Sequence, residues 1–205
     1  MANVLLFWIG LGFLLGAMPF SLWLGYLFLH TDIRHYGDGN PGATNAWKAG
    51  GWRIGVPALL LDYLKGAVPV GLAHFAAGFW GWELVSVGLA PVIGHAFSPF
   101  LGFKGGGKAL AVTFGVWTGL TLAEGPFVLG LFFAVFLLIQ TSDGWAVLLG
   151  LLAFGIYLLL QHGDRFILAI WLGNTLLLAW KYRAEFRTRP QLRGWLDRLL
   201  RQNSD

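Results

Sequence analysis

The chain is built from long apolar segments separated by shorter polar ones. A membrane-spanning helix needs about 20 mostly apolar residues, and most of these segments approach or exceed that length. We expect Pro19 to kink the first of them, and residues 109–123 form a short span unless that helix is tilted. The pattern predicts an all-α polytopic membrane protein with about seven transmembrane helices, at residues 4–29, 54–79, 84–101, 109–123, 126–140, 144–160 and 166–180.

The composition agrees with a membrane protein and excludes a soluble domain. Hydrophobic residues make up 57% of the chain and charged residues only 12%, about half the charged fraction of soluble proteins. The 11 tryptophans and 30 glycines suit membrane interfaces and close helix contacts. The absence of cysteine excludes disulfides and thiolate chemistry. No internal repeat is visible, so we expect one domain over residues 1–205, with a basic tail from about 181 to 205.

The basic residues predict how the chain is oriented. If seven spans form, twelve of the 14 Lys and Arg residues fall on one side, Arg165 alone falls on the other, and Lys65 lies within a span. Basic loops stay in the cytoplasm. The tail and the loops at 30–53 and 102–108 are therefore predicted to be cytoplasmic, with the N-terminus outside. Topology accounts for the net charge of +4, so no nucleic-acid partner is expected. The amphipathic pattern of Trp195, Leu196, Leu199 and Leu200, with Arg193, Arg198 and Arg201 between them, would let the tail lie along an anionic membrane surface.

Two polar loops carry the candidate chemistry. The loop at 30–53 is long and rich in turn-forming residues, which is typical of a functional loop. The segment at 94–113 places Lys104 and Lys108 on either side of three glycines. Glycines allow several backbone N–H groups to point at one anion, and a following helix N-terminus adds its dipole. Because Lys108 is followed by alanine, this is not a Walker P-loop. The two loops together predict a phosphate-binding site at a membrane face.

Three ionisable residues in the apolar segments have open interpretations. Asp62 and Lys65 lie three residues apart on one face of the second span. Such residues in a membrane default to a functional hypothesis, but a self-neutralising structural pair, or a pair near the membrane surface, is an equal alternative. His95 in the third span is either a packing residue or part of the lysine-bearing site. No G-x-S-x-G motif is present, which argues against serine hydrolysis.

Three motifs make the chain resemble the bacterial acyl-phosphate:glycerol-3-phosphate acyltransferase family of integral membrane enzymes. They are DIRHYGDGNPGATNAW at residues 32–47, LLDYLKG at 60–66 and GHAFSPFLGFKGGGK at 94–108, with a weaker match at MPF, residues 18–20. The resemblance covers about the first 115 residues. The remainder shares hydropathy and a basic tail but little motif.

The resemblance implies transfer of a fatty acyl group from acyl phosphate to the hydroxyl of glycerol 3-phosphate, giving lysophosphatidic acid. It implies a bacterial inner-membrane enzyme whose active site faces the cytoplasm, with membrane lipid around it and no metal or nucleotide cofactor. The donor phosphate could itself accept the hydroxyl proton. The oligomeric state and acyl length stay open. Carried onto this sequence, the expected catalytic residues are Lys104, Lys108 and Asp38, and the expected substrate-binding residues are Arg34, Asn40, Gly42, Thr44, Asn45, Lys48, His95, Gly105, Gly106, Gly107 and Arg183.

Several positions depart from the family pattern. Asp38 replaces a usual serine, Lys48 replaces a usual arginine, and Lys108 matches the second family lysine only if one glycine is inserted before it. The other departures are Ala17, Ala109, Tyr182 and Glu185. Asp38 and Glu185 add negative charge where an anionic acceptor is expected. Besides glycerol-3-phosphate acylation, the sequence therefore leaves open a different acceptor, reduced activity, a non-catalytic acyl-phosphate-binding relative and a lipid transporter.

Overall fold

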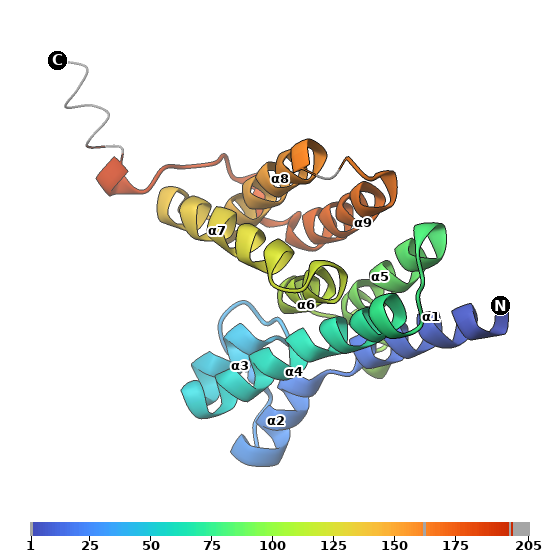
Figure 1. The fold of residues 1–205 in the computed structure, drawn as a ribbon. Helices are drawn as coiled ribbons and strands as arrows, with labels where there is room; N and C mark the ends of the chain where they lie inside the picture. The colour runs from blue at the N-terminus through green and yellow to red at the C-terminus, as the bar shows by residue number, and fades with distance from the viewer. Residues whose placement is uncertain (1, 162, 197, 199–205) are drawn as a thin grey trace. The chain divides into compact units, whose positions relative to one another are not determined.

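The structure is a computed structural model that describes residues 2–161, 163–196 and 198, and it divides into two compact units, Met1–Pro126 and Phe127–Asp205 (Figure 1). Within the described residues every regular element is helical, as predicted, and one isolated β-bridge joins Gln140 to Leu192. The α-helices are α1 (Ala2–Ala17), α2 (Phe20–Leu29), α3 (Ala43–Gly50), α4 (Trp52–Gly71), α5 (Gly81–Ala96), α6 (Leu110–Thr121), α7 (Glu124–Ile139), α8 (Asp143–Gln161) and α9 (Arg165–Tyr182).

Among the residues that the structure describes, four helical stretches are long and apolar enough to cross a membrane. They are Ala2–Leu29, Trp52–Ala76, Gly81–Leu101 and Asp143–Gln161, while α6 and α7 are shorter apolar helices. Each of the seven predicted segments forms a helix or a helix pair. The all-helical membrane architecture is therefore found, and the number of seven spans stays a prediction.

In the first unit, α4 packs most extensively against α6, and α1 packs against α5. Glycine allows the first of these pairs to approach closely. A Cβ atom on Gly66 would collide with the carbonyl oxygen of Val112, and one on Gly115 would collide with that of Tyr63. Small residues at such contacts let helix backbones touch in a membrane, so α4 and α6 form a tight pair that supports the loop preceding α6.

The helix of the first apolar segment is interrupted at Pro19, where the sequence predicted a kink. Helix α1 ends at Ala17 and α2 begins at Phe20. The break exposes carbonyl groups that need hydrogen-bond donors inside a membrane. Ser98 Oγ donates to the Ala17 carbonyl at 2.6 Å, and Lys65 Nζ donates to the Met18 carbonyl at 2.9 Å. Side chains from distant parts of the sequence therefore supply hydrogen bonds to the carbonyl groups at the helix break.

Asp62 and Lys65 form a buried ion pair. Lys65 Nζ lies 2.7 Å from Asp62 Oδ1, with the two side chains 1% and 3% exposed. Ser21 Oγ donates a hydrogen bond of 2.7 Å to Asp62 Oδ2. Because the pair contacts α2 and the break before it, these contacts favour the structural interpretation: the pair fastens α4 to the broken first segment.

The long polar loop contains a helix that the sequence did not predict. Helix α3 occupies Ala43–Gly50, and the fully buried Ile33 lies in a short 3₁₀ turn before it. These elements share an apolar cluster with α2 and α4, made of Leu22, Ile33, Ala46, Ile54 and Ala58. The apolar residues are spaced too sparsely to read as a helix, yet their burial orders the loop.

The second unit is built around α8 and α9. Asp164 Oδ1 caps α9 by accepting hydrogen bonds from the N–H groups of Phe166 and Ile167. Glu185 Oε2 accepts from Gly144 N at 2.6 Å, at the start of α8. The described part of the tail pairs with the end of α7 through Arg193 N and the Ile139 carbonyl at 2.8 Å. Leu199, Leu200 and Arg201, on which the predicted amphipathic tail depends, lie outside the described residues.

Candidate active site

The two glycine-containing loops meet at an ion pair between Asp38 and Lys108. Lys108 Nζ lies 2.9 Å from Asp38 Oδ2. The other carboxylate oxygen accepts hydrogen bonds from Asn45 Nδ2 at 3.0 Å and from the backbone N–H of Asn40 at 3.2 Å. The structure thus brings Lys108 to three residues of the other loop that the sequence also singled out.

Asp38 stays ionised because its partners outweigh its partial burial. Burial alone would raise its pKa, but the hydrogen bond and charge of Lys108, together with the hydrogen bonds from Asn40 and Asn45, lower the pKa below its usual value. The cluster is therefore a carboxylate surrounded by donors, of the kind that also bind phosphate oxygens.

Gly37 lets a second lysine approach this cluster. Its φ of 59° lies in the left-handed region that favours glycine. A Cβ atom at this position would lie 2.9 Å from Lys48 Nζ and would collide with Asn45 Oδ1. Asn45 is 1% exposed, and its Oδ1 has no hydrogen-bond partner among the described residues. A cation and an unused buried acceptor therefore lie beside Gly37, the residue that precedes Asp38.

The glycine loop, residues 102–108, packs against the C-terminal end of α5. The N–H of Gly107 donates to the His95 carbonyl at 3.1 Å. A Cβ atom on Gly107 would collide with the His95 imidazole, and one on Gly106 would collide with the carbonyl groups of His95 and Ala96. His95, 8% exposed, is thus placed under the loop, where its packing determines the course of the backbone. Ala109 follows with a φ of 63°, a conformation that glycine adopts more easily.

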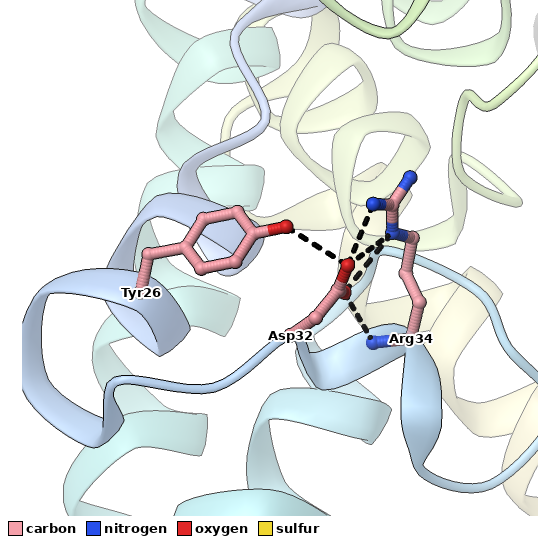
Figure 2. A network of polar contacts seen from close by, with 3 residues as sticks. All are labelled: Tyr26, Asp32 and Arg34. Carbon is pink, nitrogen blue, oxygen red and sulfur yellow. Dashed lines mark hydrogen bonds and ion pairs between the residues drawn. The ribbon is translucent and has the colours of Figure 1, made fainter.

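Arg34, which we expected to contact substrate phosphate, lies in a separate network with Asp32 and Tyr26 (Figure 2). Its Nη2 and Nε lie 2.6 Å and 3.0 Å from Asp32 Oδ2, and the Tyr26 hydroxyl donates to the same oxygen at 2.8 Å. The Arg34 hydrogen bonds hold the pKa of Asp32 far below its usual range, and Asp32 raises the pKa of Arg34. The guanidinium is therefore engaged by a neighbouring carboxylate, and its role toward substrate stays a prediction.

Comparison with known proteins matches the chain to a family model described as glycerol-3-phosphate acyltransferase over residues 6–189. The chain belongs to this family. A glycerol-3-phosphate acyltransferase of Thermotoga maritima is 38% identical over 195 residues, covering 88% of this chain and 95% of the relative. One from Maridesulfovibrio salexigens is 38% identical over 186 residues, covering 89% and 91%.

Solved structures of the acyltransferase family share the fold. The crystal structure of PlsY (YgiH), an integral membrane glycerol 3-phosphate acyltransferase in its glycerol 3-phosphate form, matches with a TM-score of 0.82 and 29% identity, covering 96% of this chain and 98% of that one. Its lysophosphatidic acid form matches with a TM-score of 0.81. The resemblance drawn from the motifs is confirmed, and it extends well beyond the first 115 residues.

The other predicted site residues of this acyltransferase have varied surroundings. Lys104 is exposed, and among the described residues only Lys108 of the two lysines pairs with Asp38. Gly42 is the N-cap of α3, and Gly105 packs near Leu101. A pocket of about 300 Å³ lies beside α3 and α4, lined by Ala43, Thr44, Trp47, Lys48, Gly55 and Leu59.

A predicted substrate-binding residue, Arg183, and a departure from the family pattern, Glu185, lie in the second unit. Arg183 donates from Nη1 to the Trp180 carbonyl at 2.8 Å and stacks over the Trp180 ring. Glu185, expected to add negative charge near the acceptor, accepts hydrogen bonds at the N-terminus of α8 instead. An acidic group is favoured there by the helix dipole, which gives Glu185 a structural reason to be present.

Sequence reasoning missed Ser98 and Ser21. Both are buried, at 2% and 0% exposed, and both bind groups at or beside the α1–α2 break. The available signal was a lone serine in an apolar segment, which must satisfy its hydroxyl within the protein. Within the described ranges, no group of three or more His, Asp or Glu residues is arranged to hold a metal ion.

Proposed function

We propose that this chain transfers an acyl group from acyl phosphate to the hydroxyl of glycerol 3-phosphate and releases inorganic phosphate and lysophosphatidic acid. The observation that carries the proposal is the Asp38–Lys108 contact, which joins the two motif-bearing loops into one anion-binding cluster. The family match at residues 6–189 runs across both compact units, which supports one acyltransferase domain over the whole chain.

The cluster suits a reaction whose main demands are charge stabilisation and alignment. Phosphate is a good leaving group, so the protein needs to hold two anions and bring the acceptor hydroxyl to the acyl carbon. Lys108 and Lys48 supply positive charge, and the amide of Asn45 supplies oriented hydrogen bonds. In this proposal the donor phosphate takes the hydroxyl proton as the ester bond forms and the acyl–phosphate bond breaks.

The pocket beside α3 supports an amphiphilic donor. Trp47 and Leu59 give it an apolar wall, and Lys48 lines the pocket while its Nζ lies beside Gly37, next to the polar cluster. An acyl chain in the pocket would leave its phosphate beside the lysine. Because the flanking helices are apolar, we place the enzyme in the bacterial inner membrane, with the cluster facing the cytoplasm on the evidence of the basic loops.

Asp38 favours one alternative activity. A carboxylate in the site repels an anionic acceptor and suits a neutral or cationic hydroxyl compound. This second candidate keeps the acyl-phosphate donor and changes only the acceptor. A screen of glycerol 3-phosphate against glycerol and aminoalcohols, with acyl phosphate constant, distinguishes the two from the mass and charge of the ester formed.

The test uses the purified full chain in lipid with acyl phosphate and glycerol 3-phosphate. We expect lysophosphatidic acid and acceptor-dependent phosphate release. Lys108→Ala should lower turnover at least about tenfold, because one stabilising charge is removed, while Lys108→Arg should retain more activity. Absence of both products in the wild type would reject the proposal, and unchanged kinetics in Lys108→Ala would remove that lysine from the site.

A further inference from the structure

The donors of the anion-binding cluster are already occupied by an anion that belongs to the chain. Lys108 Nζ, Asn45 Nδ2 and the Asn40 N–H converge on the Asp38 carboxylate at 2.9, 3.0 and 3.2 Å. An ammonium, a side-chain amide and a backbone N–H are also the groups that bind phosphate oxygens. A carboxylate and a phosphate placed here compete for the same donors.

We propose that the Asp38 carboxylate is a tethered competitor of substrate phosphate, which must displace it from Lys108 in order to bind. Asp38 would then determine how tightly this enzyme binds its phosphate-bearing substrates, without touching the reacting atoms. The inference rests on the proposed acyltransferase function and adds to it a residue that determines affinity.

The Asp38–Lys108 contact is accessible enough to exchange. The side chains of Lys108 and Asp38 are 25% and 48% exposed, and ion pairs in contact with water are weak. A phosphate group carries up to two negative charges and several acceptor oxygens, whereas the carboxylate carries one charge. A phosphate entering from the water therefore outcompetes Asp38 at sufficient concentration.

Displacement does not require the loop to unfold. Asp38 keeps two partners on its own side of the cluster, the N–H of Asn40 and the amide of Asn45. Lys108 comes from the other loop and is the only one of the three donors that must turn away. Since its partners lower the pKa of Asp38, the competing charge persists at neutral pH.

The same contact has a second interpretation as a latch that aligns the two loops. The two interpretations differ in the kinetic parameter that changes. Removing a competitor lowers KM for the phosphate-bearing substrates and lowers the inhibition constant of inorganic phosphate. Removing a latch lowers kcat or raises KM.

The experiment measures both quantities in the full-length Asp38→Asn and Asp38→Ser variants. Asparagine preserves the shape and most hydrogen bonds but removes the charge. We expect KM for at least one phosphate-bearing substrate, and the inhibition constant of inorganic phosphate, to fall about two- to fivefold, the size of one exposed ion pair. Unchanged or higher values in both variants would overturn the proposal.

Two controls keep this result separate from other causes. Glu83→Gln removes one negative charge from an exposed residue at the start of α5, and it should leave both constants unchanged. Equilibrium binding of inorganic phosphate to the same proteins needs no turnover. If wild-type protein proves inactive, the proposed function fails, and tighter phosphate binding by Asp38→Asn still decides whether Asp38 competes.

Discussion

Two carboxylates in the long polar loop form ion pairs of different kinds. Asp38 reaches across to Lys108 on the other loop, whereas Asp32 binds Arg34 two residues away. The first contact therefore joins two parts of the fold, and the second stabilises a local turn. The motif shows which basic residues are present, but it does not show which of them is already paired with a carboxylate.

The Asp32 contact predicts a specific loss of stability in acid. Its pKa is lowered in the folded state from an unfolded value of 3.8. Its stabilising contribution is therefore complete above pH 3.8 and is lost as the pH falls below that value. We expect wild-type protein to have a higher Tm than Asp32→Asn near neutral pH, with the difference shrinking as the pH falls below about 4.

Thermal unfolding in detergent across this pH range checks the prediction. Tyr26→Phe is a useful comparison, because it removes one hydrogen bond to Asp32 and keeps the ion pair. A Tm difference between wild type and Asp32→Asn that does not change with pH would contradict the assignment.

The helices of the first unit are held together by hydrogen bonds from side chains that are far away along the sequence. The Ala17 and Met18 carbonyls at the α1–α2 break are bound by Ser98 and Lys65. Ser98 also begins the segment that leads into the glycine loop, so one residue supports both the helix break and the loop. This arrangement explains why polar residues persist in otherwise apolar segments.

Lys65→Met should destabilise the fold strongly. It leaves the buried Asp62 without its counter-charge and the Met18 carbonyl without its donor. Breaking one side of a buried ion pair costs about 3–5 kcal/mol. The double variant Asp62→Leu with Lys65→Met should recover part of this loss, because no charge remains buried alone.

Unfolding free energies of the single and double variants, measured in the same detergent, test the pairing. Equal losses in the two would show that the ion pair has no special role, and no loss in Lys65→Met would show that the break does not depend on it.

The contact between α4 and α6 provides a second prediction. A methyl group on Gly115 would collide with the Tyr63 carbonyl and lie 2.8 Å from the Ala67 nitrogen. Gly115→Ala should therefore cost about 1–3 kcal/mol through overpacking. Gly10→Ala is the matched control, because nothing lies within 4 Å of the added atom. A Tm of Gly115→Ala equal to or higher than the Tm of Gly10→Ala would contradict the close approach of the two helices.

The molecule as a whole is predicted to lie in the membrane with its basic segments in the cytoplasm. The chain contains no cysteine, so single cysteines can be introduced without background. In right-side-out vesicles, an impermeant maleimide should label Glu83→Cys and spare Gln191→Cys, both of which are exposed positions. Labelling of both residues from the same side would reject the seven-span topology.

The sequence by itself determined the membrane class, the helical segments, the two polar loops and the family. Hydrophobic length is a local property, and the motifs are contiguous, so both can be read without coordinates. The same reasoning placed Lys108, Asn45 and Asp38 among the site residues, but it placed Arg34 with them although its guanidinium is held by Asp32.

Only the tertiary structure decided which groups pair. The Asp38–Lys108 contact, the Lys65 and Ser98 bonds to the α1–α2 break and the Glu185 bonds to α8 all join residues far apart along the chain. Helix α3 likewise depends on burial against α2 and α4. The physical reason is common to these cases: a buried or half-buried polar group takes the partner that packing brings near, and the local sequence contains no record of that partner.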